Sequence, residues 1–308
     1  MSTETIEHTF SVNAPARLSL ANMRGSVEIT AGEADVMYIQ AKKHLESGEA
    51  EHTRVLIRQA EDGRVSAETR FEGVNWFTLP TTKPCKVDYL VHIPRECDLQ
   101  IKCVSSSLSV QGVSGTMNIS TVSGALKLVD VTGSLQVKSV SGDISAEKVS
   151  AQLALETVSG DLLLTDSKLT RLEASTVSGD LFIQSLSSSS PVHLKSVSGE
   201  VALHVPEQTG LTIRSQSISG DVVTTLPVTQ RQKSFGETRV IIGGGETPIL
   251  HRSISGDLII KGGGSVGSPA SAAEQESQGH MDILERIERG EMSVEEALHS
   301  LQPESPLS

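Results

Sequence analysis

The sequence is poor in aromatic residues and in cysteine. Of its 308 residues, 3% are aromatic, and only three are cysteines, Cys85, Cys97 and Cys103. The cysteines are odd in number and lack the spacing of a metal site, so we expect buried, reduced thiols without a disulfide framework. With so few large rings, a core must be built from small aliphatic side chains, which suits a narrow interior.

Long apolar runs and basic clusters are missing as well. No run of about 18 apolar residues occurs, so the sequence predicts no membrane span. The N-terminal segment has neither the basic nor the apolar region of a signal peptide, and we therefore expect a cytoplasmic protein. The net charge is −12, which argues against nucleic-acid binding because Lys and Arg supply the affinity for phosphates.

Motifs that carry catalysis are also missing. The nine histidines are scattered, and none lies in HExxH spacing. There is no GxSxG, no P-loop and no GxGxxG after a predicted strand. We predict no enzymatic activity, no cofactor and no metal ligands. A polysaccharide-active β-helix enzyme is the least favoured alternative, since it would need acids and bases that interrupt the repeat in one groove.

A single short motif dominates what is present. Val-Ser-Gly, or a close variant, recurs at intervals of nine residues and, after Gly160, at intervals of 19, 20, 21 and 36. An active site is normally unique in a chain, whereas self-similarity at a near-fixed period is typical of repeat architectures. We therefore interpret the motif glycines as structural: Gly115, Gly124, Gly142, Gly160, Gly179, Gly199, Gly220 and Gly256.

The residues around each glycine alternate between apolar and polar. Positions two and four after it are usually apolar, as Leu162 and Leu164 are after Gly160. The Val or Ile two residues before it has the same parity, so the alternation predicts that it faces inward as well. The glycine either faces inward within a strand or supplies unusual backbone angles at a bend. One unit cannot bury its apolar face alone, but stacked units can. The sequence predicts an all-β fold, a β-solenoid or single-stranded β-helix-like stack.

Acidic residues that follow the glycines, such as Asp143, Asp161 and Asp180, should form a row. If rungs stack about 4.8 Å apart, neighbouring charges repel by about 0.9 kcal/mol in water. We favour a solvated Ser/Asp face, on which Asp161→Asn would change stability little. A face that binds a cation or a glycan is the alternative. The Ca²⁺-binding nonapeptide repeat shares the period but has a different glycine pattern.

Residues 1–100 read as less regular strands that belong to the same domain as the regular repeats 101–262. Asp62-Gly63 predicts a hairpin turn, and Gly25 lies in an early copy of the repeat. An irregular loop carries Trp76 and Phe77. We interpret these two rings as a cap over the open end of the core in preference to a binding platform.

The C-terminal segment has a different character. Residues 263–280 read as a flexible Gly/Ser-rich linker, and residues 281–302 as a helical hairpin. From Ala270 to Ser308, nine acids oppose two arginines, a net charge of −7. Helices this short are marginal alone, so we expect their apolar stripes to bind a protein partner or a second copy. The stripe residues are Ile283, Leu284 and Ile287 in the first helix and Val294, Leu298 and Leu301 in the second.

Three segments carry a resemblance to a known family. SLANMRGSVEIT, then VDYLVHIPRECDLQIKCVSSSLSVQGVSGTMNISTVSGALKL, then the serial Val-Ser-Gly-Asp strands resemble the bacterial putative-adhesin β-repeat family of unknown function. The tail resembles the SHOCT-like helical hairpin of LiaX/YvlB-type proteins, which usually carry it at the N-terminus. The resemblance implies a β-repeat fold and a link to cell-envelope stress. We predict a non-enzymatic structural or interaction scaffold whose C-terminal helices mediate assembly or partner binding. The alternative is a cation- or glycan-binding β-solenoid module.

Overall fold

The computed structural model describes residues 2–72, 82–184, 187–188, 190–234 and 236–263. By contacts the chain divides into two compact units, Met1–Gly264 and Ser265–Ser308. The predicted helical hairpin, most of the predicted linker, and Trp76 and Phe77 lie outside the described residues. Within them the fold is all-β, as predicted, and the one helical turn is the 3-10 turn η1 (Leu45–Ser47).

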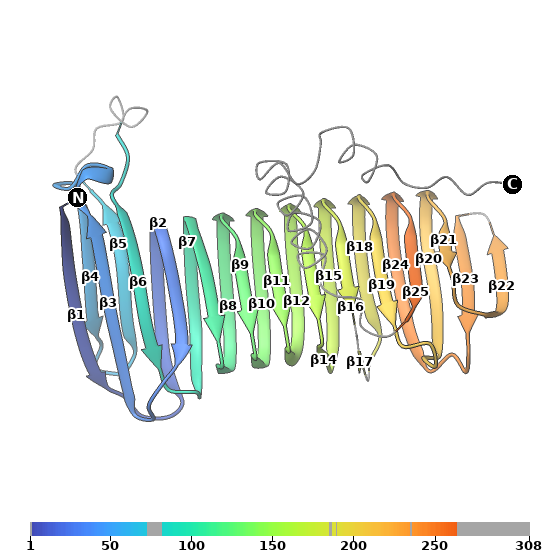
Figure 1. Ribbon diagram of the computed structural model, residues 1–308, viewed down its shortest axis with the longest axis horizontal. Coiled ribbons are helices and arrows are strands. Elements are labelled where there is room, and N and C mark those ends of the chain that lie inside the picture. Colours follow the sequence, from blue (N-terminus) through green and yellow to red (C-terminus); the bar gives the residue numbers. More distant parts are fainter. Residues whose placement is uncertain (1, 73–81, 185–186, 189, 235, 264–308) are drawn as a thin grey trace, which may run out of the picture. The chain divides into compact units, whose positions relative to one another are not determined.

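The repeat folds into rungs, each of which is one coil of the chain. A rung has a long strand, a bend at a motif glycine, and a short strand, and successive rungs pair in parallel and in register. Figure 1 shows the strands of successive rungs side by side. The long strands are β8 (Ser114–Ser123), β10 (Thr132–Ser141), β12 (Ser150–Ser159), β15 (Arg171–Ser178), β18 (Val192–Ser198), β20 (Leu211–Ser219) and β24 (Thr247–Ser255). The short strands are β9 (Leu126–Val129), β11 (Ile144–Glu147), β13 (Leu162–Thr165), β16 (Leu181–Gln184), β19 (Val201–Val205), β21 (Val222–Thr224) and β25 (Leu258–Gly262).

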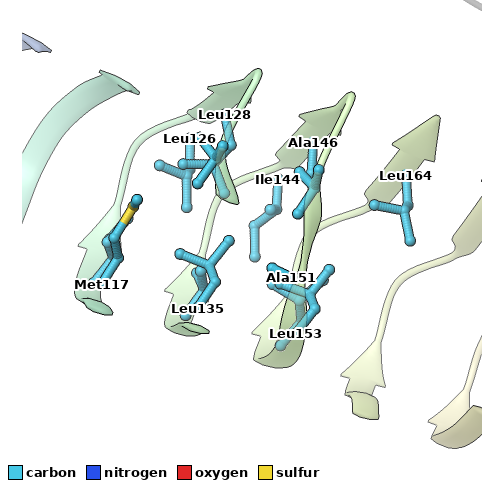
Figure 2. Packing of buried hydrophobic residues seen from close by; sticks show 14 of the residues in the cluster. Met117, Leu126, Leu128, Leu135, Ile144, Ala146, Ala151, Leu153 and Leu164 are labelled. Atoms are coloured by element: carbon cyan, nitrogen blue, oxygen red, sulfur yellow. The ribbon is translucent and has the colours of Figure 1, made fainter. Parts of the chain in front are cut away.

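The core lies between the long and the short strands. Met117, Leu135 and Leu153 are aligned across three long strands, and Figure 2 shows them together with Leu126 and Ile144 of the short strands. All five side chains are at most 2% exposed. Burying one such side chain contributes about 1.5–3 kcal/mol. Because one rung supplies only a few of them, the fold depends on stacking, as the sequence predicts.

The repeated motif has two structural roles, which explains its spacing. In the first rungs, one copy of the motif begins the long strand and the next copy forms the bend. Two nine-residue intervals therefore make one rung of 18 residues, as from Gly124 to Gly142. In the next rung the opening copy carries Ala151 in place of glycine, and after Gly160 only the bend copy recurs, so the spacing rises to 19 residues or more.

The predicted inward orientation of the motif valines is confirmed for one role and wrong for the other. Val131, which begins a rung, is fully buried, but Val140, just before a bend, is 49% exposed. Before the bend the buried residue is instead Ser139, three positions before the glycine. The chain changes direction at the glycine, so alternation does not continue through it.

At the N-terminus, residues 1–100 join the stack through two unbroken strands, β2 (Ala16–Ala31) and β7 (Cys97–Gln111), which pair in parallel. The strands β5 and β6 pair with β2 in parallel. Beyond them, β4 pairs antiparallel with β5, β3 with β6, and β1 with β3. The predicted hairpin at Asp62-Gly63 is confirmed as the β4–β5 turn. These strands are β1 (Thr3–Ser11), β3 (Val36–His44), β4 (Thr53–Gln59), β5 (Val65–Phe71) and β6 (Lys86–Ile93).

At the other end, order in the stack departs from order in the chain. The β24–β25 rung lies between the β18–β19 and β20–β21 rungs, although it comes last in sequence (Figure 1). The intervening chain forms the hairpin β22 (Val228–Ser234) and β23 (Glu237–Ile242), and β23 pairs antiparallel with β20. A separate two-stranded sheet joins β14 (Lys168–Leu169) and β17 (Ser187–Ser188).

Candidate functional site

The bend between long and short strands is the feature that recurs in every rung. At Gly160 the backbone φ is +124°, and a Cβ there would lie 2.5 Å from the carbonyl oxygen of Gly142 in the preceding rung. The glycine therefore supplies unusual backbone angles and also allows close approach between rungs. The same contact with the neighbouring rung occurs at Gly124, Gly142, Gly179, Gly199, Gly220 and Gly256, whereas Gly115 opens a rung and lies against Cys97.

The acidic residues after the glycines connect one rung to the next. Oδ1 of Asp143 accepts a hydrogen bond from the backbone N–H of Asp161 (3.0 Å). In the same way, Oδ1 of Asp161 accepts the backbone N–H of Asp180 (2.9 Å), and Oδ1 of Asp180 accepts the backbone N–H of Glu200 (2.8 Å). Asp143 and Asp161 are exposed, and Asp180 is half-buried. The expectation of a merely solvated row is therefore wrong, because each of these carboxylates also holds a main-chain amide of the next rung.

One β-branched side chain projects outward from β7 and from each of the seven rungs, where it lies just before the bend. Seven of the eight are 41–51% exposed, and Ile218 is 84% exposed. We call this set the outer apolar row: Val104, Val122, Val140, Val158, Val177, Val197, Ile254 and Ile218, in the order of the stack. Each member precedes an exposed or half-exposed serine such as Ser141 or Ser159. Sequence alternation missed this row. The signal that could have found it is the Ser or Thr three positions before each glycine, which takes the inward place.

A shorter apolar row lies on the outer surface of the short strands. Leu163, Phe182, Ala202 and Ile259 are aligned on neighbouring rungs. Ala202 is only 4% exposed, and the other three are half-buried. This row covers fewer rungs than the outer apolar row.

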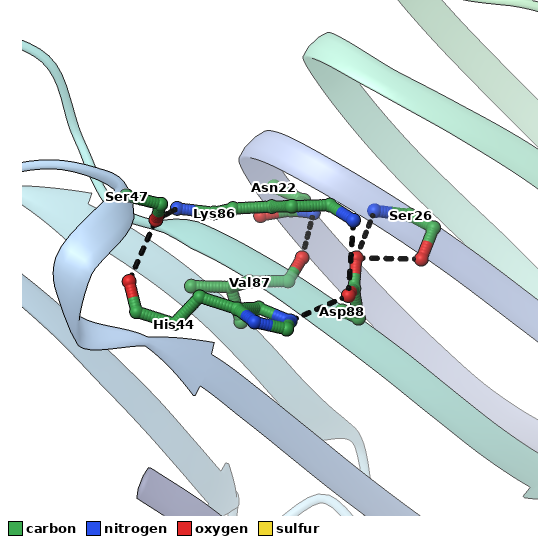
Figure 3. Close-up of polar contacts among 7 residues, drawn as sticks. All are labelled: Asn22, Ser26, His44, Ser47, Lys86, Val87 and Asp88. Atoms are coloured by element: carbon green, nitrogen blue, oxygen red, sulfur yellow. Dashed lines mark hydrogen bonds and ion pairs between the residues drawn. The ribbon is translucent and has the colours of Figure 1, made fainter. Parts of the chain in front are cut away.

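A polar cluster connects three strands near the N-terminus (Figure 3). Oδ1 of Asp88 on β6 accepts hydrogen bonds from the N–H (2.9 Å) and Oγ (2.7 Å) of Ser26 on β2. Its Oδ2 lies 2.8 Å from Nε2 of His44 and 3.3 Å from Nζ of Lys86. Burial raises the pKa of Asp88, but the contacts with Ser26, His44 and Lys86 outweigh burial and leave it below its usual value. The hydrogen bond from the Ser26 N–H to Asp88 is of the same kind as the bonds that the acids of later rungs accept from a neighbouring strand. The cluster therefore stabilises the pairing of these strands.

The three cysteines carry unreactive thiols. All three cysteines are buried and free, and burial raises the pKa of Cys97 to about 12 and that of Cys103 to about 11. Such thiols are inert as nucleophiles. Among the residues that the structure describes, no three His, Cys, Asp or Glu side chains come close enough to hold a metal ion. No helix in the same residues is long and apolar enough to cross a membrane.

The predicted partner-binding residues of the tail lie outside the described residues. They are Ile283, Leu284, Ile287, Val294, Leu298 and Leu301.

These features define a parallel β-solenoid with a glycine bend in each rung and antiparallel strands at both ends. The profile of the Toastrack DUF4097 family matches residues 16–261, and the chain belongs to that family. No curated protein matches the chain.

Several solved structures are similar to the chain. A putative adhesin from Bacteroides fragilis is 12% identical with a TM-score of 0.44, over 83% of this chain and 97% of its own. A putative adhesin from Parabacteroides distasonis is 11% identical with a TM-score of 0.43, over 84% and 97%. A structure from the same species, titled a putative lipid binding protein, is 13% identical with a TM-score of 0.36, over 84% and 96%.

Proposed function

We propose that the protein is a non-enzymatic scaffold that binds a protein partner along the outer apolar row. The observation that carries this proposal is the continuity of the row, in which strand β7 and the seven rungs that follow it each expose one Val or Ile. Large contiguous apolar surfaces on proteins mark interaction sites more often than isolated exposed side chains do. A parallel β-stack also holds the spacing of such side chains rigidly.

The flanking chemistry supports a protein partner. Beside the row are the serines of the motif and, on the preceding outward positions, Lys138, Glu156 and Lys195. Lys138 and Glu156 form an ion pair of 2.7 Å. An apolar centre with a polar rim is the usual anatomy of a protein interface.

We further propose that the C-terminal hairpin mediates assembly or tethering, and that the protein works in the cytoplasm in the response to cell-envelope stress. The support for the hairpin is its sequence, since its two apolar stripes are too short to be stable without packing against something. A cation- or glycan-binding Ser/Asp face is the second candidate. Titration with Ca²⁺ while following the melting temperature tests it, because a ligand that binds the folded state raises that temperature.

The leading proposal is tested with the variant Val140→Lys/Val158→Lys/Val177→Lys in the full chain. Its matched control is Ser109→Lys/Ser145→Lys/Thr165→Lys, which adds the same charge outside the row, on β7 and on the short strands β11 and β13. We expect the first variant to keep its melting temperature and to lose the partners that wild type captures from a bacterial extract, while the control keeps them. Capture of the same partners by both variants would show that the row is not the binding surface.

The hairpin is tested separately with Leu284→Asp/Leu298→Asp. A charge on each stripe is costly to bury, so self-association measured by light scattering, or partner capture, should fall without a change in the melting temperature of the stack. Unchanged mass and unchanged partners would identify the tail as a passive acidic extension.

A further inference from the structure

The last rung of the stack, β20–β21, has an outer edge that is only partly covered. β20 pairs with β24 as far as Ser219, but with β23 on its other side only as far as Gln216. β21 pairs with β25 alone among the described strands. Ile218 is 84% exposed, well above the other members of the outer apolar row. From Ser217 to Thr224 the outer edge therefore carries no strand among the residues that the structure describes.

Bonds between earlier rungs show what this edge is shaped to accept. In each rung the N–H two residues after the bend glycine donates to the next rung, as Leu162 does to the carbonyl of Asp180 (2.9 Å) and Leu258 does to that of Asp221 (3.0 Å). The same position in the last rung is Val222, which has no following rung.

The backbone of Val222 faces away from the stack. The carbonyl of Asp221 and the N–H of Thr225 both bond to β25, and alternate residues of a strand point to opposite sides. Consistent with this, the carbonyl of Val222 accepts Nη2 of Arg231 on β22 (2.8 Å). By the same alternation its N–H points toward the outer edge. An edge with free backbone groups is a template for another strand.

Asp221, the acid of the last rung, also has no following rung to bind. Oδ1 of Asp257 accepts the N–H of Asp221 (2.9 Å), as in the earlier rungs. Oδ1 of Asp221 should then accept an amide from a following rung, but it contacts Nζ of Lys233 (2.7 Å), a side chain that is 69% exposed. Two flexible cationic side chains, Arg231 and Lys233, thus hold positions that a further strand would occupy.

Space for such a strand lies along the edge. A groove of about 620 Å³ runs between the end of β20 and the β22–β23 hairpin, with Ile218, Asp221 and Lys233 in its walls. A second hollow of about 450 Å³ shares Asp221 and Lys233 and continues beside β21. Ser217, also in the groove wall, has a buried Oγ without a hydrogen-bond partner among the described residues.

We propose that this edge binds an extended peptide segment of a partner protein, which adds to β20–β21 as one more parallel strand. Strand addition to an open sheet edge is a recurring mode of peptide recognition. One residue of the segment donates its N–H to Oδ1 of Asp221 and accepts the N–H of Val222 at its carbonyl, and Lys233 and Arg231 move aside.

The stack also sets the sequence of the segment. A Cβ at Gly256 would lie 2.1 Å from the carbonyl oxygen of Gly199, and one at Gly220 would lie 2.2 Å from that of Gly256. A strand in the same register on Gly220 therefore requires a glycine opposite it, immediately before the residue that binds Asp221. The site lies at the end of the stack, away from Val140, Val158 and Val177. The test of this proposal is therefore independent of the test of the binding surface at those three residues.

The probe is a fluorescently labelled synthetic peptide with the sequence of residues 139–146, SVSGDISA, which matches the length of the open edge from Ser217 to Thr224. It is titrated with the full-length protein and followed by anisotropy. We expect Ile218→Arg, which places a long charged side chain in the groove, to weaken binding by at least about tenfold. The matched control Val140→Arg, on the same row but away from the edge, should leave binding unchanged. Lys233→Ala frees Asp221 and should tighten binding by about threefold or more.

The glycine requirement is tested in the peptide itself. Replacing the glycine that corresponds to Gly142 with valine should weaken binding by at least about tenfold. Hydrogen exchange of residues 217–224 should slow when the unmodified peptide is added. The proposal would be overturned if both peptides bound equally well, or if Ile218→Arg and Val140→Arg weakened peptide binding equally. It would also be overturned if the peptide did not bind even to the Lys233→Ala variant. Concentration-dependent self-association through this edge that excludes the peptide would overturn it as well, because the occupant would then be a second copy.

Discussion

The backbone N–H of Asp180 donates to Oδ1 of Asp161 across 2.9 Å, and the two residues hold the same place in successive rungs. The row of acids therefore has a structural use, although like charges repel along it. Each carboxylate lies at the bend, where the glycine interrupts the regular alternation of strand residues. The side chain there supplies an acceptor for the amide of the following rung.

Removal of one of these acceptors should weaken the stack. Asp161→Ala leaves the Asp180 amide without its acceptor, and we expect the free energy of unfolding to fall by about 1 kcal/mol, the usual net value of a hydrogen bond. Asp161→Asn keeps an oxygen at the same place and should cost less. Urea unfolding followed by circular dichroism measures both, with Ser145→Ala as a surface control within about 0.5 kcal/mol of wild type. Equal stability of Asp161→Ala and wild type would restore the solvated-face interpretation.

The bend glycines should tolerate no side chain. Gly160→Ala and Gly179→Ala place a Cβ within 2.5 Å and 2.3 Å of a carbonyl oxygen of the neighbouring rung. They also require a positive φ, and we expect each to cost about 3 kcal/mol or more. The control is Gly63→Ala at the β4–β5 turn, where φ is +78° but nothing lies within 4 Å of the Cβ, so the cost should be about 1 kcal/mol. Similar melting temperatures for the three variants would contradict the close-approach argument.

Local pattern predicted the all-β class, the stacking and the β4–β5 hairpin, because each rests on a few neighbouring residues. The same pattern misplaced the valines before the bends. Val131 and Val140 stand in nearly identical sequence, Val-Thr-Gly and Val-Ser-Gly, yet one begins a strand and the other precedes a change of direction. Which role a copy takes depends on the neighbouring rung, and the motif alone does not contain that information.

The arrangement of the last rungs could not be predicted either. The copies at Gly220 and Gly256 look alike, and nothing near them indicates that the later one pairs between its predecessors. The 36-residue interval between them contains the β22–β23 hairpin. The open edge beside Asp221 follows from this rearrangement, so only the three-dimensional pairing reveals it.

The two roles of the motif give a matched pair of substitutions. Val131 is fully buried and Val140 is 49% exposed. Val131→Thr buries a hydroxyl in an apolar place and should cost about 1–3 kcal/mol, whereas Val140→Thr should stay within about 0.5 kcal/mol of wild type. Both have the same change in volume and strand propensity. Equal losses in the two variants, measured by thermal unfolding, would mean that Val140 is covered in solution.

His251 should make the stability depend on pH. Its ring is buried, Nδ1 lies 2.9 Å from Oγ of Ser215, and burial lowers its pKa from 6.5 to about 4. Between these values the unfolded chain binds a proton that the folded protein does not, so stability falls as the pH falls from 6.5 through 4. The loss approaches about 3 kcal/mol at the lower limit, by 1.36 kcal/mol for each pKa unit. Asp88, whose pKa is below the usual value of 3.8, loses its contribution only below that value, so the two windows are separate.

Urea unfolding of wild type and His251→Gln across pH 4 to 7 tests this assignment. Glutamine does not titrate and can keep a hydrogen bond to Ser215, so the difference in stability between the two proteins should shift in favour of the variant as the pH falls. The other histidines are common to both proteins and cancel in that difference. A difference that stays constant across this range would show that the folded protein accommodates the charged ring of His251, and that the solenoid interior is wetter at this rung than its burial indicates.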